Sequence, residues 1–355
     1  MPPLLIGIVG AGNIGRIHAR AIESLGESIT AVADIDPASR ESFANEFDVA
    51  STYDDYRTML DAEPLDLVIV AVPNSLHAEC AIAVLEADVD AFVEKPLAHT
   101  LEDAERLAAV EAESAGRVFV GFVRAFEPWV DEIRSAIDAG ELGEVYDIDA
   151  TFVRRRGIPQ LGSWFTRKDV SGGGAVIDIG VHVVHLALHL LDFPEVETVS
   201  AMTGSHFGSK AEYTYLNMWG GAPVDDGAFD VDDYARALVR TADGVTLHLH
   251  LAWASNGESN QSLRIYGDRA GATIDGAGST QRATLYSTRG DGLTDTELHL
   301  PDSDRFNEQW EYVLAVTRGD VEPSHNTLEE GLAVQRVVDA IYESAETKRE
   351  VVLTE

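Results

Sequence analysis

Residues 4–15 read Leu-Leu-Ile-Gly-Ile-Val-Gly-Ala-Gly-Asn-Ile-Gly, and this stretch decides the fold. The apolar run Leu4 to Val9 predicts a buried strand, and a helical pattern runs from about Asn13 to Leu25. Between them stands Gly-x-Gly-x-x-Gly, in which successive glycines allow a tight turn, close approach to a pyrophosphate, and close packing of helix on strand. The sequence therefore predicts a dinucleotide-binding strand-turn-helix unit built on Gly10, Gly12 and Gly15.

An acidic residue at the end of the second predicted strand indicates which dinucleotide binds. The helix N-terminus, at Asn13 and Ile14, offers backbone N–H groups to a pyrophosphate. A strand from Ile29 to Ala33 ends at Asp34, 19 residues after the last glycine of the motif. A carboxylate there accepts hydrogen bonds from the adenosine ribose and repels a 2′-phosphate, so NAD is favoured. Arg40, six residues later, could accommodate a 2′-phosphate, so NADP stays open as an alternative cofactor.

Strand and helix patterns then alternate through the first third of the chain. Strands are predicted at 67–72, 89–93 and 118–122, with helices at 37–46, 54–60, 75–87 and 100–115. Such alternation is typical of a parallel sheet with right-handed crossovers. We therefore predict an α/β Rossmann domain, a doubly wound parallel sheet, at residues 1–122.

Beyond residue 122 the pattern changes. An amphipathic helix follows Pro128, and long strands with period-two patterning come later, at 145–154, 231–240, 245–254, 262–266 and 283–287. Hairpins between such strands favour antiparallel pairing. We expect an α+β domain with a mainly antiparallel sheet at 123–355, closed by helices at 305–317 and 327–345.

The charge balance excludes two classes of partner. The 355 residues include 61 acidic against 26 basic ones, which gives a formal net charge of −35 at pH 7. Only four of the basic residues are lysines: Lys95, Lys168, Lys210 and Lys348. Nucleic acid and anionic membranes need basic patches, so neither is an expected partner. The acidic excess and the scarcity of lysine predict a halophilic protein.

Other features bear on the compartment. No signal-peptide pattern opens the chain, and no apolar run is expected to reach the roughly 18 residues of a membrane span. The single cysteine, Cys80, excludes an intramolecular disulfide and suits a reducing environment. We expect a soluble, cytoplasmic protein.

Charged residues stand at the end of one predicted strand, in Ala91-Phe92-Val93-Glu94-Lys95-Pro96. Ligands of open α/β sheets bind beyond the carboxyl ends of the strands, so Lys95 is a candidate reactive group. Pro96 ends the strand and biases Lys95 toward an extended backbone. Pro73, Asn74 and His77 follow another strand and are candidates to line the same cofactor cleft; alternatively, His77 is a helix N-terminal residue without a ligand.

A second motif starts at the glycines 172–174. Residues four apart on a helix share a face, so Asp178 and His182 point the same way, and His185 and His189 extend the stripe. A carboxylate that orients an imidazole is typical of a general acid/base pair. The alternatives are a helix-surface ion pair and a metal site. We rank metal last because no thiolate or second acidic cluster completes a ligand set.

Arginines and aromatic residues surround this motif. Alternation along a strand would put Arg154 and Arg156 on one face and Arg155 on the other. They either bind an oxygen-rich or anionic substrate or pair with acids at a subunit interface. Trp164 is either a core residue or a platform for a substrate. An insert between His206 and Asp226 is a candidate cover for the cleft, with Tyr213, Tyr215 and Trp219.

Together these residues resemble the Gfo/Idh/MocA family of glucose-fructose oxidoreductase and inositol dehydrogenase. The shared motifs are the glycine-rich turn, Val-Pro-Asn-x-x-His, Glu-Lys-Pro, the glycines that lead to His182, and Ala-Ile-Tyr-Glu-Ser-Ala at 340–345. The resemblance implies a Rossmann domain followed by a large, mostly antiparallel sheet, used for homodimer or homotetramer contacts. It also implies NAD(P)-linked oxidation of a sugar, inositol or related polyol.

The same resemblance assigns roles to individual residues. Catalytic positions fall on Lys95, Asp178 and His182, and positions near the nicotinamide ribose fall on Asn74 and Glu94. The candidate substrate contacts are Lys95, Arg156, Trp164, Asp178, His182 and His185. Two positions depart from the family: aspartate is common where His185 stands, and a second arginine is common where Ala125 follows Arg124.

Oxidation of an alcohol removes a hydride from carbon and a proton from oxygen, so one base is needed. The reference pKa of histidine, about 6.5, lies near the working range, whereas that of lysine, about 10.4, would have to fall by roughly three units. We expect His182 to accept the proton, Asp178 to orient it, and Lys95 to stabilise the developing alkoxide. Lys95 as the base stays open. Two other functions also stay open: a nucleotide-sugar dehydrogenase whose diphosphate the arginines hold, and a non-catalytic NAD(P)-binding regulator.

Overall fold

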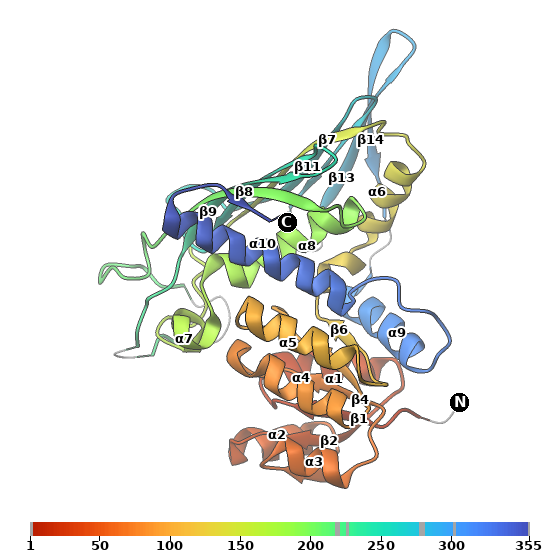
Figure 1. Cartoon of the computed structure of the whole chain (residues 1–355), viewed down its shortest axis with the longest axis vertical. Helices are drawn as coiled ribbons and strands as arrows, with labels where there is room; N and C mark the ends of the chain where they lie inside the picture. Colours follow the sequence, from red (N-terminus) through yellow and green to blue (C-terminus); the bar gives the residue numbers. More distant parts are fainter. Residues whose placement is uncertain (1–2, 217–220, 225–226, 277–280, 301–302, 354–355) are drawn as a thin grey trace. The chain divides into compact units, whose positions relative to one another are not determined.

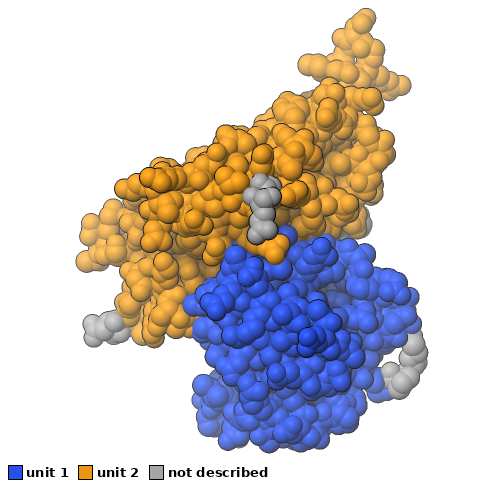
Figure 2. Space-filling model, viewed as in Figure 1, with its two compact units in different colours: residues 1–126, 303–335 blue, residues 127–302, 336–355 orange. Residues whose placement is uncertain are grey.

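The structure, a computed structural model, describes residues 3–216, 221–224, 227–276, 281–300 and 303–353 (Figure 1). The chain forms two compact units (Figure 2). Unit 1 comprises residues 1–126 and 303–335, and unit 2 comprises residues 127–302 and 336–355. Residues 303–335 therefore group with unit 1, whereas the boundary predicted from sequence assigned everything after residue 122 to the second domain.

Unit 1 contains a six-stranded parallel sheet in the order β3-β2-β1-β4-β5-β6. Its strands are β1 (Ile6–Val9), β2 (Ile29–Ala33), β3 (Ser51–Tyr53), β4 (Leu67–Val70), β5 (Asp90–Val93) and β6 (Val118–Val120). The connecting helices are α1 (Asn13–Ser24), α2 (Pro37–Glu46), α3 (Tyr56–Ala62), α4 (His77–Glu86) and α5 (Leu101–Glu111), with short 3₁₀ turns η1 (Asn74–Leu76) and η2 (Val123–Phe126). The order reverses beside β1, as in a doubly wound sheet, so the predicted Rossmann fold is confirmed.

A helix from late in the chain completes the core of unit 1. Helix α9 (Arg305–Thr317) packs against α1 and buries Trp310 and Val313 in the same apolar cluster as Ile8 and Phe92. Helix α10 (Leu328–Thr347) follows, and its residues are divided between the two units. Local periodicity predicted both helices but gave no sign that α9 returns to the first unit.

Unit 2 is built on a nine-stranded sheet in the order β14-β13-β12-β11-β7-β10-β9-β8-β15. The strands are β7 (Val145–Val153), β8 (Val196–Gly204), β9 (Tyr234–Thr241), β10 (Thr246–Ala252), β11 (Asn260–Gly267), β12 (Gly271–Asp275), β13 (Arg282–Arg289), β14 (Gly292–Leu298) and β15 (Val351–Val352). Within this nine-stranded sheet, β7 and β10 are the only described strands that pair in parallel. The predicted mainly antiparallel sheet is confirmed.

Unit 2 also contains helical elements. They are α6 (Pro128–Asp138), the 3₁₀ turn η3 (Trp164–Thr166), α7 (Lys168–Ser171), a π-helical turn η4 (Val176–Gly180) and α8 (Val181–Leu190). Helix α8 packs on β7 (Figure 1), and the turn η4 packs on β10. A Cβ on Gly180 would lie 2.7 Å from the Leu251 side chain, so the glycine allows the turn to approach the sheet closely.

The expectation that no apolar stretch is long enough for a membrane span needs correction. Among the described residues, the helical segment Lys168–Leu190 is long enough and apolar enough to cross a membrane, by length and composition alone, with a mean hydropathy of 1.5. However, 94% of its most apolar window is buried inside the protein. Burial of this extent is typical of a core helix, because its apolar side chains are covered by protein.

Candidate active site

The glycine-rich turn between β1 and α1 fits a dinucleotide. Gly10 has a φ of +104°, and a Cβ there would lie 2.3 Å from the carbonyl oxygen of Ala71. A Cβ on Gly15 would lie 2.3 Å from the carbonyl oxygen of Gly10, so α1 can pack on the turn only without it. A Cβ on Gly12 would meet no protein atom within 4 Å. This open space lies at the N-terminus of α1, where a pyrophosphate is favoured.

Asp34 lies beside this turn. Its Oδ2 accepts a hydrogen bond from the Ala11 N–H at 2.7 Å, and its Oδ1 accepts one from the Asp36 N–H at 2.8 Å. A carboxylate has about four lone-pair sites, so acceptor capacity remains for ribose hydroxyls. Arg40 donates to the backbone carbonyl of Asp34, which fixes the guanidinium near the same strand end.

Glu94 and Lys95 follow the last residue of β5, at the carboxyl edge of the sheet, as predicted. Glu94 is buried at 7% exposure, and Lys95 is half-buried. The peptide bond between Lys95 and Pro96 is cis. This edge is where open α/β sheets bind their ligands.

His77 joins the loop after β4 to the loop after β5. Its Nδ1 lies 2.7 Å from the carbonyl oxygen of Pro96, and its Nε2 lies 2.9 Å from that of Val72. Burial lowers the pKa of the imidazole, against the opposite effect of these two carbonyl oxygens. The ring is almost fully buried, so the structure places it between backbone segments. Asn74, in η1, is also buried.

In unit 2, Asp178 lies in the π-helical turn, and His182 follows one turn later at the start of α8. The Trp253 indole N–H donates to Asp178 Oδ2 at 2.8 Å, and Arg154 Nη1 lies 3.9 Å from the same oxygen. Asp178 is 8% exposed, and His182 is half-buried. π-Helical turns are frequent at functional sites, because they shift side chains out of α-helical register.

Asp232 fixes the loop that precedes this turn. Its carboxylate accepts the N–H groups of Gly174 at 2.8 Å and Val176 at 3.0 Å, and the Tyr342 hydroxyl at 2.8 Å. Burial raises the pKa of Asp232, and these hydrogen bonds offset the effect only in part. A Cβ on Gly174 would lie 1.8 Å from the Asp232 carbonyl oxygen. The glycine run is therefore needed for close packing of the loop that leads to Asp178.

The predicted alternation of the three arginines does not hold. Strand β7 ends at Val153, so the period-two pattern stops before them. Arg154 lies toward Asp178, while Arg156 donates to the Ser255 carbonyl at 2.7 Å and to Asn256 Oδ1 at 3.0 Å. The Arg156 guanidinium also lies over the rings of Phe207 and Tyr213. It ties the start of the aromatic insert to the loop after β10.

The remaining candidates lie in different surroundings. Trp164 is half-buried and stacks on Phe165, with ring centroids 3.8 Å apart. His185 is fully buried, and its ring contacts those of His189 and Phe193, which places it in the interior of unit 2. Trp219 lies outside the described residues. Within the described part of the chain, no group of three or more His, Cys, Asp or Glu side chains is arranged to hold a metal ion.

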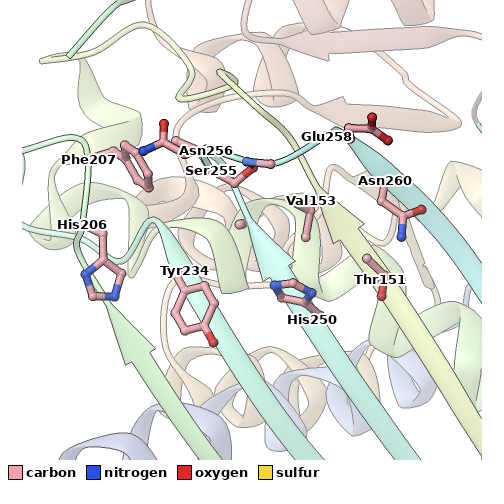
Figure 3. A pocket seen from close by; sticks show the side chains of 13 residues that line it. Thr151, Val153, His206, Phe207, Tyr234, His250, Ser255, Asn256, Glu258 and Asn260 are labelled. Atoms are coloured by element: carbon pink, nitrogen blue, oxygen red, sulfur yellow. Dashed lines mark hydrogen bonds between the residues drawn. The ribbon is translucent and has the colours of Figure 1, made fainter.

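Unit 2 also has a pocket of about 410 Å³ (Figure 3). Its lining includes Tyr234 and His250 from the sheet and His206, Asn256 and Glu258 from loops. Within β10, His250 and Ala252 line the pocket, and successive side chains of a strand point to opposite faces. Leu251, between them, lies against Gly180 of the π-helical turn, so the pocket and the turn that carries Asp178 lie on opposite faces of the sheet.

Sequence patterns did not indicate four residues that contact the candidate residues or their loops: His18, Asp232, Trp253 and Trp310. The side-chain contacts of Asp232 and Trp253 described above lie 56 to 110 positions away in the sequence, and Trp310 donates to His18 across 292 positions. No spacing rule reaches that far. The usable signal was chemical, since a buried tryptophan usually finds an acceptor for its N–H.

Comparison with known proteins follows the division into two units. The family model described as "Oxidoreductase family, NAD-binding Rossmann fold" matches residues 4–122, and the "GFO/IDH/MocA C-terminal domain" model matches residues 130–273. D-glucoside 3-dehydrogenase of Escherichia coli (strain K12) is 30% identical over 351 residues, which cover 97% of this chain and 96% of that protein. Inositol 2-dehydrogenase of Rhizobium meliloti (strain 1021) is 26% identical over 97% of this chain and 98% of its own.

Solved structures share the fold. An oxidoreductase domain protein from Kribbella flavida superposes with a TM-score of 0.86 at 24% identity, over 100% of both chains. Levoglucosan dehydrogenase, in complex with NADH and levoglucosan, gives a TM-score of 0.85 at 22% identity, again over 100% of both chains. At these identities the likeness establishes the architecture of both units.

Proposed function

Since the chain belongs to the Gfo/Idh/MocA oxidoreductase family and has its NAD-binding Rossmann fold, we propose that it is an NAD-dependent dehydrogenase of a sugar or related polyol. The observation that supports this most is Asp178. It is a nearly buried carboxylate held by an indole N–H, with His182 one turn further along the same helical segment. Together with Lys95 at the carboxyl end of β5, this supplies a base, its orienting group and a cation.

Each residue has one role in the proposal. His182 accepts the proton of the substrate hydroxyl, because its reference pKa of about 6.5 needs little adjustment. Asp178 fixes the orientation of the imidazole and stabilises its charged form. Lys95 binds the hydroxyl oxygen and stabilises the negative charge that develops on it. NAD, when bound, supplies the hydride acceptor.

The cofactor would be held along the carboxyl edge of the unit 1 sheet. The open space at Gly12 and the amides of Asn13 and Ile14 suit the pyrophosphate. Asp34 would accept the adenosine ribose hydroxyls, so NAD is preferred to NADP. Asn74 and Glu94 would lie toward the nicotinamide ribose. His77 contributes as a positioning residue, since it joins the Val72 and Pro96 loops.

A sugar or polyol is the proposed substrate because full-length relatives are named as D-glucoside and inositol dehydrogenases. A nucleotide sugar is the second candidate, favoured by the run Arg154 to Arg156 and by a relative named as a UDP-kanosamine synthase subunit. Against it, Arg154 lies toward Asp178 and Arg156 is bonded to the chain's own loop. Trp164, half-buried and stacked, is the proposed platform for a sugar face.

The test is a panel of hexoses, pentoses, glycosides, inositols and nucleotide sugars with NAD or NADP, followed by the absorbance of reduced cofactor. Lys95→Ala and His182→Ala should each lower kcat by about 100-fold or more, the range typical of general acid/base and electrostatic groups. Binding of NAD should be unchanged in both variants. The control is His248→Ala, an exposed histidine of β10 paired with Asp147.

The possible results separate the alternatives. Turnover confined to nucleotide sugars selects the second candidate. Tight NAD binding without turnover of any panel member supports a regulator. Near-normal kcat in the Lys95→Ala or His182→Ala enzyme rejects the assigned role of that residue.

A further inference from the structure

A chain of hydrogen bonds crosses the core of unit 1 from Trp310 to Glu94. Trp310 Nε1 donates to His18 Nδ1 at 3.0 Å, and His18 Nε2 lies 2.9 Å from Glu94 Oε1. Trp310 and His18 are fully buried, and Glu94 is 7% exposed. The three residues come from α9, α1 and the end of β5, and all belong to unit 1.

The direction of these hydrogen bonds follows from the chemistry of the indole. Its N–H can only donate, so His18 Nδ1 must accept. The ring hydrogen therefore lies on Nε2 and is donated to Glu94 Oε1. The other oxygen, Oε2, accepts the backbone N–H of Lys95 at 3.1 Å. Both carboxylate oxygens of Glu94 thus face N–H donors, which favours the ionised form.

The surroundings keep this arrangement in place. The His18 ring lies edge-on to Phe92 and Trp310, with ring centroids 5.0 and 5.5 Å away. A Cβ on Gly121 would lie 2.9 Å from Glu94 Oε1, so the carboxylate fills the space that this glycine leaves. Burial raises the pKa of Glu94, but the hydrogen bond from His18 and the nearby charges, among them that of Lys95, together outweigh burial, and the pKa lies below its usual value. Glu94 is therefore a fixed, buried anion.

We propose that Trp310 and His18 hold the Glu94 carboxylate as a fixed negative charge at the carboxyl end of β5, and that this charge favours oxidised NAD over NADH. Ligands of such sheets bind at this edge, and the two redox forms differ by one positive charge on the nicotinamide ring. An anion in a partly buried site attracts the charged ring more strongly than water would allow. Trp310 and His18 act through Glu94, so both are positioning residues.

Lys95, the next residue, carries the opposite charge. It stays unchanged in every variant below, so differences between variants report on Glu94 alone. The inference rests on NAD binding and requires no substrate. Failure of the proposed sugar oxidation would leave it intact, and its failure would leave the sugar oxidation intact.

The first test compares dissociation constants of NAD⁺ and NADH by calorimetry for the wild type and Glu94→Gln. The amide keeps the shape and removes the charge. We expect NAD⁺ to lose about tenfold in affinity relative to NADH, equivalent to about 1.4 kcal/mol. The matched control is Glu105→Gln on the exposed face of α5, which should leave the ratio unchanged. Equal weakening of NAD⁺ and NADH binding would make Glu94 a ribose contact only and would overturn the proposal. Affinities unchanged for both forms would overturn it as well.

The second test separates the hydrogen bond from packing. In His18→Gln, the side-chain amide is placed to donate toward Glu94, and the affinity ratio should stay within about twofold of the wild type. In His18→Asn, the amide reaches the position of Nδ1 only, and the ratio should move most of the way to that of Glu94→Gln. Equal ratios in the two variants would remove His18 from the proposal. If either variant fails to fold, Trp310→Phe replaces it, because this change leaves His18 Nδ1 without its hydrogen-bond donor. A wild-type affinity ratio in Trp310→Phe would remove Trp310 from the proposal.

Discussion

Asp178 shows how a single residue of this site depends on distant partners. The carboxylate is nearly buried, a state that is costly for a charge unless donors satisfy it. Trp253 supplies an N–H at 2.8 Å, and Arg154 supplies a guanidinium 3.9 Å away. Both partners lie at the ends of strands β10 and β7, which pair in parallel beneath the π-helical turn. Removal of one donor should therefore alter the orientation of the carboxylate while leaving the sheet intact.

Trp253→Phe tests this dependence. The change removes the N–H and keeps an aromatic ring, and a hydrogen bond to a charged group is worth about 1.5–3 kcal/mol, so we expect kcat to fall roughly tenfold or more. The matched control is Trp129→Phe, which removes a buried indole N–H that donates to Glu127 at 2.9 Å in the same unit. Both variants should lose similar thermal stability, but only the first should lose turnover. An equal effect on kcat would mean that Trp253 matters only for packing.

At the scale of elements, two glycines at the start of helix α1 are required for different structural reasons. The space around the missing Cβ is open at Gly12, whereas at Gly15 it is closed by the Gly10 carbonyl oxygen 2.3 Å away. Gly12 has a φ of −75°, a backbone that alanine also adopts. The first glycine is therefore not needed for folding, and the second is.

Gly12→Ala and Gly15→Ala should separate these reasons. Without cofactor, Gly12→Ala should melt within about 2 °C of the wild type, because an exposed substitution without a clash changes stability by at most about 0.5 kcal/mol. Its affinity for NAD should fall at least tenfold, because the methyl group occupies the space proposed for the pyrophosphate. Gly15→Ala should lower the melting temperature of the cofactor-free protein. Normal NAD affinity in Gly12→Ala would argue against the proposed pyrophosphate position.

Whether an element could be predicted depended on how far apart in the sequence its contacting residues lie. Strand β1 is an apolar run directly before a glycine-rich turn, so local sequence determined both the strand and the turn. The return of α9 depends on Trp310 packing against Phe92 and His18, residues more than 200 positions away. The prediction for the arginine run at 154–156 failed for a local reason, because β7 ends at Val153, before the first of the three arginines. The roles of Lys95, Asp178 and His182 stay predictions.

At the scale of the whole molecule, the dominant feature is the charge. The formal net charge of −35 comes from acids spread along the chain. Arginines do form ion pairs at the surface, among them Arg20 with Glu46 and Arg57 with Glu79. Such exposed pairs contribute about 0–1 kcal/mol each, and salt weakens them. Repulsion among the unpaired acids acts in the opposite direction, and salt relieves it.

We expect this relief to prevail, so the protein should become more stable as salt is added. Self-repulsion destabilises a compact state of high net charge, and the screening length falls from about 8 Å at 0.15 M salt to about 3 Å at 1 M. The melting temperature should therefore rise between these concentrations of sodium chloride. Sucrose at increasing concentration is the control, because it favours burial of surface without screening charge. Substitution of exposed acids by their amides should raise stability at low salt and flatten the salt dependence. A protein that is most stable in dilute buffer would show that its acidic surface is not an adaptation to salt.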